Sequence, residues 1–216
     1  MIELNEISKT YTTQSGRHHV LDHISLTIQR GDKLGILGRN GAGKSTLIRI
    51  LSGIEPPTSG RVTRRMTISW PLAFAGGFQG SLTGIDNFKF ISRVYGIDYR
   101  SKLDFVDDFS ELGKFMREPV KRYSSGMRAR LAFAISMAIE FDCYLIDEVS
   151  AVGDSRFREK CENELFLKRG DRTMIIVSHQ PEQIRQHCNR FCVLEKGKII
   201  NFDKADSAYD YYAQWQ

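Results

Sequence analysis

The chain has 216 residues, of which 41% are hydrophobic and 26% are charged, and its net charge is +5. This length allows one well-buried domain, or one core with a smaller lobe, and the ordinary composition excludes a disordered, fibrous or coiled-coil protein. Lysines and arginines are scattered rather than clustered, so we expect no nucleic-acid partner. No apolar run approaches the roughly 18 residues of a membrane-spanning helix. Because Met1–Glu6 carries acid where a secretory signal needs positive charge, we expect a cytoplasmic chain.

Two segments near the N-terminus alternate apolar and polar residues, as half-buried strands do. They are Ile2–Ile7 and Val20–Ile28, and Gln14–Gly16 supplies a turn between them, which predicts an antiparallel pair. Strands covered on both faces are indicated by three later apolar runs, at Lys33–Leu37, Cys143–Ile146 and Thr173–Val177. We therefore predict an α/β fold with a mostly parallel central sheet.

A long stretch between the first two of these runs, Ser81–Ala138, has apolar residues at helical spacing and few strand signals. It predicts a helical lobe inserted into the sheet domain. Near the C-terminus, Phe191–Glu195 and Lys198–Phe202 flank the dipeptide Lys196-Gly197, which predicts a two-residue hairpin. The aromatic tail Lys204–Gln216 predicts a short helix.

A glycine-rich loop follows the Lys33–Leu37 strand and opens a helix that Gly53 is placed to end. Its sequence, Gly38-Arg39-Asn40-Gly41-Ala42-Gly43-Lys44-Ser45, fits the phosphate-loop pattern. The glycines let successive N–H groups face one oxyanion, and the helix start adds about half a positive charge. We predict that Lys44 reaches the terminal phosphates of a nucleotide, Ser45 binds Mg²⁺ and Thr46 contacts phosphate.

Two carboxylates, Asp147 and Glu148, end the strand predicted at Cys143–Ile146. Parallel strands place them at the sheet edge where the phosphate loop also lies. We predict that Asp147 holds Mg²⁺ through water and that Glu148 orients or deprotonates the attacking water. His179 follows the strand Thr173–Ser178 and is predicted to sense the terminal phosphate. The alternatives are a solvated acidic strand end and a structural histidine.

A second predicted anion site begins the helical run Arg128–Ile139, because serine and glycine stand at its start in Tyr123-Ser124-Ser125-Gly126-Met127. One nucleotide does not need two such sites in one chain. We therefore predict a head-to-tail homodimer, in which the Ser124–Gly126 segment of each chain closes over the nucleotide held by its neighbour. The alternative is a simple helix cap.

These motifs occur in the order found in ABC transporter ATPase subunits, which the chain resembles over nearly its whole length. The resemblance implies a P-loop NTPase domain of the ABC type over residues 1–216, with a mostly parallel central sheet, an antiparallel β subdomain and a helical subdomain inserted at about 76–141. It implies that the nucleotide is ATP, that Tyr11 stacks on adenine and that Asp154 belongs to a loop crossing the dimer interface. Gln79 is the nearest match to the family's coupling glutamine, because Trp70–Phe74 stands in its usual place; it would reach the metal or water.

The stretch from Gly76 to Gly84, running on to Asp86-Asn87-Phe88, resembles the subgroup that exports capsular polysaccharide. The resemblance implies a peripheral protein at the cytoplasmic face of the bacterial inner membrane. There it would power export through a separate membrane-spanning permease, which handles the glycan. Within transport, the alternatives are export of O-antigen, teichoic acid or another lipid-linked glycan, and drug efflux. A soluble ABC ATPase acting on nucleic acid or ribosomes is less favoured, since the chain has one cassette and no heptads, and a small-molecule kinase still less.

Overall fold

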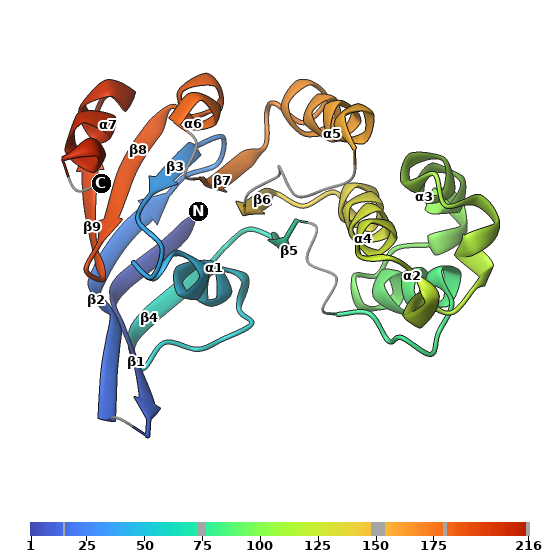
Figure 1. The fold of residues 1–216 in the computed structure, drawn as a ribbon, viewed down its shortest axis with the longest axis horizontal. Helices are drawn as coiled ribbons and strands as arrows, with labels where there is room; N and C mark the ends of the chain where they lie inside the picture. Colours follow the sequence, from blue (N-terminus) through green and yellow to red (C-terminus); the bar gives the residue numbers. More distant parts are fainter. Residues whose placement is uncertain (15, 73–76, 148–153, 179–180, 215–216) are drawn as a thin grey trace. The chain divides into compact units, whose positions relative to one another are not determined.

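The computed structural model describes residues 1–14, 16–72, 77–147, 154–178 and 181–214. The chain divides into two compact units. Figure 1 shows the chain coloured along its sequence. The first comprises Met1–Pro71, Asp142–Glu148 and Asp171–Gln216, and the second comprises Leu72–Phe141 and Val149–Gly170. In the part of the chain that the structure describes, no helix has both the length and the apolar character needed to cross a membrane.

An antiparallel sheet in the first unit has the strand order β2-β1-β4, where β1 is Ile2–Thr13, β2 is Gly16–Ile28 and β4 is Ser59–Arg64. The pairing predicted for the first two strands is confirmed, with Ile2 opposite Ile28 and Thr13 opposite Gly16. Both strands extend beyond their predicted bounds into mostly polar residues, which are half-buried or exposed in β1 and exposed in β2 and carry no apolar alternation. β4 was not predicted for the same reason, since it is polar along most of its length.

A six-stranded sheet forms the rest of this unit's β structure, and four of its five strand pairings are parallel, which confirms the predicted central sheet. In order across the sheet, the strands are β5 (Ile68–Pro71), β6 (Cys143–Asp147), β7 (Thr173–Val177), β3 (Lys33–Leu37), β8 (Arg190–Glu195) and β9 (Lys198–Phe202). The predicted hairpin β8–β9 is also confirmed, and Lys196 and Gly197 adopt φ values of 45° and 79° in its turn. β5 was not predicted, because it is a four-residue edge strand that ends in proline.

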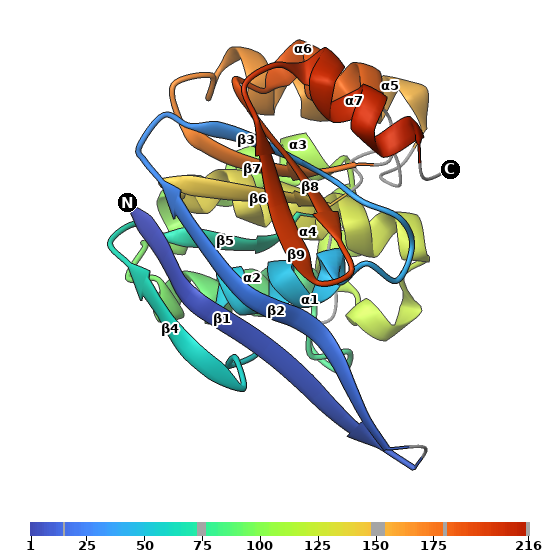
Figure 2. The same ribbon diagram turned by 90° about the vertical axis from the view of Figure 1, so that its left-hand side faces the viewer.

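Helices cover both faces of the six-stranded sheet. Figure 2 shows α6 (Pro181–His187) and α7 (Ala205–Ala213) on one face and α1 (Lys44–Ser52) on the other, where it packs against β5 and β6. The core of the unit lies around α1, whose inward side chains are wholly buried: Leu47, Ile48, Ile50 and Leu51. This packing fixes the start of α1 beside the ends of the parallel strands.

The second unit is helical over most of its described length. Its helices are α2 (Gly84–Val94), α3 (Leu103–Ser110), α4 (Ser125–Ile139) and α5 (Ser155–Glu162), with short 3₁₀ turns at Tyr99–Lys102, Gly113–Arg117 and Val120–Arg122 and a π-helical turn at Asn163–Leu167. Three phenylalanines hold α3, α4 and α5 together, because the Phe109 ring lies 5.7 Å from both the Phe133 and the Phe157 ring. α5 was not predicted, since only Phe157 and Cys161 of its eight residues are buried.

Candidate nucleotide-binding site

The phosphate loop, residues 38–45, connects β3 to α1 as predicted. Gly38 and Gly43 are buried at its two ends, whereas residues 39–41 between them are exposed. No side chain caps the start of α1, and the first turn of the helix carries no acid. The N–H groups of this turn and the positive end of the helix dipole therefore suit an anion placed against the loop.

Glycine is needed at position 43 for two reasons. Its φ of 105° lies in the left-handed region, which L residues adopt only at a cost. A Cβ atom there would also lie 2.9 Å from the carbonyl oxygen of Val20, which is too close for a carbon atom. The loop thus approaches β2 as closely as a backbone without a side chain permits.

Lys44 lies over its own loop. Its ammonium donates hydrogen bonds to the carbonyl oxygens of Gly38, at 2.6 Å, and Arg39, at 2.9 Å. Both acceptors are neutral, so the positive charge of Lys44 is not cancelled by these contacts. A phosphate oxygen at the loop can therefore compete for this ammonium with a full opposite charge.

The parallel register places Asp147 at the same edge of the sheet as the phosphate loop. Asp147 of β6 and Ile36 of β3 both lie opposite Val177 of β7, so one strand separates the acid from the strand that leads into the loop. Ser45, in the first turn of α1, is exposed, and α1 packs against β6. Asp147 and the phosphate loop are thus brought to one edge, as predicted. The other two residues predicted at this edge, Glu148 and His179, lie outside the described residues.

The oxygen donors at this edge fit Mg²⁺ bound together with phosphate. Among the described residues, no group of three or more His, Cys, Asp or Glu side chains is placed to hold a metal. Mg²⁺ commonly takes only one or two protein oxygens and fills its remaining positions with water and phosphate oxygens. One hydroxyl, Ser45, and one carboxylate, Asp147, are the kind of donor set that such a shared ion requires.

Tyr11, on β1, belongs to a polar cluster that the sequence did not reveal. Its hydroxyl donates to Glu55 Oε2 at 2.8 Å and accepts from Arg49 Nη2 at 3.1 Å. The same Arg49 nitrogen donates to Thr46 Oγ1 at 3.2 Å. Hydrogen bonds from Lys9, Tyr11 and Arg49 outweigh desolvation and hold the pKa of Glu55 at about 2. The cluster therefore connects Tyr11, the residue predicted to stack on the base, to Thr46, which is predicted to contact phosphate.

The Ser124–Gly126 segment lies in the second unit, at the start of α4. Ser124 is the helix cap, since its hydroxyl accepts a hydrogen bond from the N–H of Met127 at 3.1 Å. A pocket of about 310 Å³ opens beside this helix start. It is lined by Glu111, Leu112, Phe115, Ser124, Gly126, Met127 and Arg130. The cap and the predicted anion site are compatible, because the capping bond uses one serine lone pair and leaves the hydroxyl proton available.

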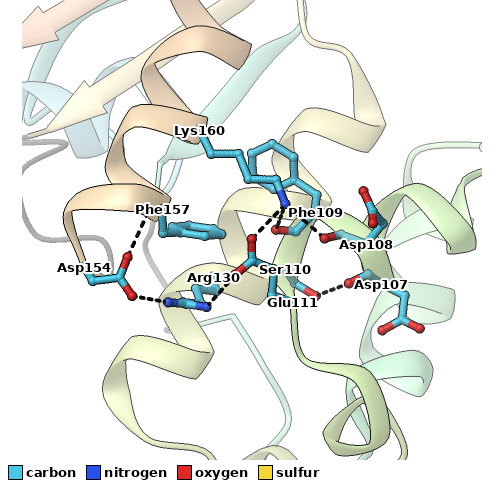
Figure 3. Close-up of polar contacts among 9 residues, drawn as sticks. All are labelled: Asp107, Asp108, Phe109, Ser110, Glu111, Arg130, Asp154, Phe157 and Lys160. Carbon is cyan, nitrogen blue, oxygen red and sulfur yellow. Dashed lines mark hydrogen bonds and ion pairs between the residues drawn. The ribbon is translucent and has the colours of Figure 1, made fainter.

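Asp154 begins α5 and accepts a hydrogen bond from the N–H of Phe157 at 2.9 Å. Figure 3 shows its other oxygen paired with Arg130 of α4, at 2.9 Å. Arg130 also pairs with Glu111, at 3.3 Å, and Lys160 completes the cluster at 3.1 Å from Glu111. The Phe157 N–H and the Arg130 guanidinium keep the pKa of Asp154 below its usual range. Arg130 was not singled out from the sequence, although its place six residues after Ser124 puts it on the same helix.

Gln79 precedes α2 in the second unit, and its side chain is exposed. Asn87 fixes the backbone here, because its amide oxygen accepts from the N–H of Gln79 at 2.8 Å and its amide nitrogen donates to the Gln79 carbonyl at 3.1 Å. The contact of Gln79 with metal or water remains a prediction.

Comparison with known proteins identifies the family. A family model described as ABC transporter matches residues 21–151. The capsule polysaccharide export ATP-binding protein CtrD of Neisseria meningitidis serogroup B is 59% identical over 212 residues, which cover 98% of each chain. The polysialic acid transport ATP-binding protein KpsT of Escherichia coli is 43% identical over 219 residues, which cover 100% of this chain and 98% of that protein.

A solved structure shares the fold. It is a dimeric, post-hydrolysis state of the ATP-binding cassette MJ0796 bound to ADP and Pi, and it matches with a TM-score of 0.77 at 22% identity, over 94% of this chain and 98% of that one. The fold predicted from the order of the motifs, a P-loop ATPase domain of the ABC type, is therefore confirmed. With the family model matching more than half of its length, the chain belongs to the ABC transporter family.

Proposed function

We propose that this chain is the ATP-binding and ATP-hydrolysing subunit of an ABC transporter that powers export of capsular polysaccharide. The observation that carries the proposal is the uncapped start of α1 behind a glycine loop, in a chain 59% identical to a capsule polysaccharide export ATP-binding protein. That similarity covers 98% of the chain, so both units are included.

We assign to the nucleotide-site residues the roles that their motifs predict. The N–H groups of residues 38–46 and the Lys44 ammonium hold the phosphates of ATP, and Tyr11 stacks on the adenine. Ser45 and Asp147 hold Mg²⁺, with Asp147 acting through water, and the ion offsets the crowded phosphate charge. Glu148 orients or deprotonates the attacking water, and His179 contacts the terminal phosphate.

Two copies of the chain enclose two ATP molecules in the proposed machine. The start of α4, through Ser124, Ser125 and Gly126, closes over the nucleotide of the neighbouring copy, and Asp154 lies at the interface between the copies. We also propose that the helical subdomain, at about 76–141, is an insertion in a single ATPase domain that passes this closure to the permease. Two apolar side chains one turn apart on α2, Phe90 and Val94, are 60% and 65% exposed and suit such a contact.

The location follows from this partner. We propose that the chain is held at the cytoplasmic face of the inner membrane by its permease. The polysaccharide is then handled by the permease, and the chain contributes the energy of ATP hydrolysis.

ATP turnover by the purified chain tests the enzymatic part of the proposal. Lys44→Ala should abolish phosphate release, and Glu148→Gln should bind Mg·ATP without hydrolysing it and accumulate as a nucleotide-bound dimer. Lys204→Ala is the matched control, because Lys204 is also at a helix start and lies outside the site. Normal turnover by the Lys44 or Glu148 variant would show that the assignment is wrong.

Surface glycan in the source bacterium tests the export part. Deleting the gene should remove capsule from the cell surface, and a plasmid copy should restore it only when Lys44 is intact. Other lipid-linked surface glycans are measured in the same strains, because their loss with capsule retained would assign the chain to a different substrate. Normal capsule on the deletion strain would contradict capsule export.

A further inference from the structure

Arg49 stands between the two ends of the proposed nucleotide site. It belongs to the last turn of α1, and one of its terminal nitrogens contacts both the Tyr11 hydroxyl and the Thr46 hydroxyl. Resting on the proposed function, we propose that Arg49 is a positioning residue for ATP. It holds Tyr11 in place for the base and orients the Thr46 hydroxyl toward a phosphate.

At the base end, the protein already uses the Tyr11 hydroxyl. Its proton is donated to Glu55 and its oxygen accepts from Arg49, so the hydroxyl has no donor left for a base. What Tyr11 offers is the face of its ring, and the two hydrogen bonds fix the plane of that ring. Base contact at this site is therefore stacking, and its strength depends on how well the ring is held in advance.

At the phosphate end, the contact between Arg49 and Thr46 orients the proton of the Thr46 hydroxyl. Thr46 is 6% exposed and lies in the first turn of α1, next to Lys44 and Ser45. Because its oxygen accepts from the Arg49 guanidinium at 3.2 Å, its own proton remains to be donated to another acceptor. A cationic donor on the oxygen also strengthens that outgoing bond. Arg49 thereby prepares Thr46 as a donor to a phosphate oxygen.

Glu55 keeps Arg49 in this bridging position. The Arg49 side chain is 42% exposed, so burial alone does not fix its guanidinium. Glu55 accepts from its Nε at 3.0 Å, and Lys9 holds Glu55 in turn at 2.8 Å. Lys9 also donates to the carbonyl of Pro56 at 2.8 Å, which ties the loop that carries Glu55 to β1. Arg49 serves Glu55 through its Nε and the Tyr11 and Thr46 hydroxyls through its Nη2, whereas the donors of a lysine all start from one nitrogen at the end of a flexible chain.

Titration calorimetry with two ligands separates the two ends of the site. Mg·ATP has both base and phosphates, and Mg·tripolyphosphate has phosphates alone. We expect Arg49→Met to weaken Mg·ATP about 10-fold or more and Mg·tripolyphosphate about 3-fold, from hydrogen bonds of ordinary strength. Tyr11→Phe should weaken only Mg·ATP, by about 3-fold, and Arg49→Lys should recover only part of either loss. Affinities are taken per folded molecule, with folding checked by near-UV circular dichroism.

The control is Arg93→Met, an exposed arginine in the last turn of α2 that lies outside the site. Two results would overturn the inference: wild-type affinities in Arg49→Met, or a loss for Mg·ATP that is no greater than the loss for the base-free ligand. The double variant Arg49→Met with Tyr11→Phe should lose less Mg·ATP affinity than the product of the two single fold-losses, since both substitutions remove the same hydrogen bond. Failure of the folded wild-type chain to bind Mg·ATP would instead overturn the proposed function.

Discussion

The close contact between Gly43 and β2 predicts different costs for alanine at two positions of the phosphate loop. At position 43, alanine would adopt φ 105° at a cost of about 1–2 kcal/mol. Its Cβ would lie 2.9 Å from the Val20 carbonyl oxygen and 2.9 Å from Leu21 Cδ2, and Leu21 is 1% exposed. Relieving such overpacking costs a further 1–3 kcal/mol or so. We therefore expect Gly43→Ala to lower the free energy of unfolding by about 2–5 kcal/mol.

Gly41 is the control, because it has a φ of 83° but a Cβ added there would meet no atom of the described residues within 4 Å. Gly41→Ala should lower the free energy of unfolding only by the conformational cost of about 1–2 kcal/mol. Urea unfolding of the nucleotide-free proteins, followed by far-UV circular dichroism, measures both. Gly43→Ala should also unfold at a temperature lower by about 4–20 °C. Equal stability of the two variants would refute the contact between the loop and β2 as the reason for glycine at position 43.

Three further predictions concern the other parts of the site. Ser124→Ala removes the helix cap and should lower the free energy of unfolding, measured in urea, by about 1 kcal/mol. Ser124→Asp should keep the cap and still abolish ATP turnover, measured as phosphate release, because its carboxylate would face a phosphate. The pKa of Glu55 is about 2 in the folded chain against an ordinary 4.5, so its contribution to stability is complete above pH 4.5 and is lost as pH falls through 2. Glu55→Gln should accordingly flatten the acid limb of stability by about 1 kcal/mol between these pH values, after allowance for solvent screening. A double-mutant cycle of Arg130→Met with Asp154→Asn should give a coupling of about 0.5 kcal/mol in thermal unfolding, since Asp154 is mostly exposed; zero coupling would contradict the pairing in Figure 3.

The parts of the fold that sequence predicts are those whose residues are apolar throughout or are set by a local motif. β3, β6 and β7 are almost wholly buried, so their apolar runs mark them directly. The phosphate loop has a fixed spacing of glycines that determines its backbone. β4 and α5 have mostly polar or exposed residues, so their few apolar residues show neither the alternation of a strand nor the spacing of a helix.

The contacts of the candidate site were harder to predict than its residues. Tyr11 of β1 and Arg49 of α1 are hydrogen-bonded although they are 38 residues apart, and nothing in the local sequence of either residue indicates the other. The carbonyl contacts of Lys44 likewise depend on the closed shape of the loop rather than on residue type. Hydrogen bonds between distant segments follow from tertiary packing, which a single sequence does not specify.

The strand order across the six-stranded sheet has a consequence for synthesis of the chain. β3, which leads into the phosphate loop, lies between β7 and β8, and both of these are made after the entire second unit. In a nascent chain that has emerged only as far as α4, β3 therefore has no partner strand on either side. Pairing of such distant segments is slow, because a long loop must close first. β3 gains both of its neighbouring strands only after β8 has been made, so chains whose translation stops earlier carry the phosphate-loop sequence beside an incomplete sheet.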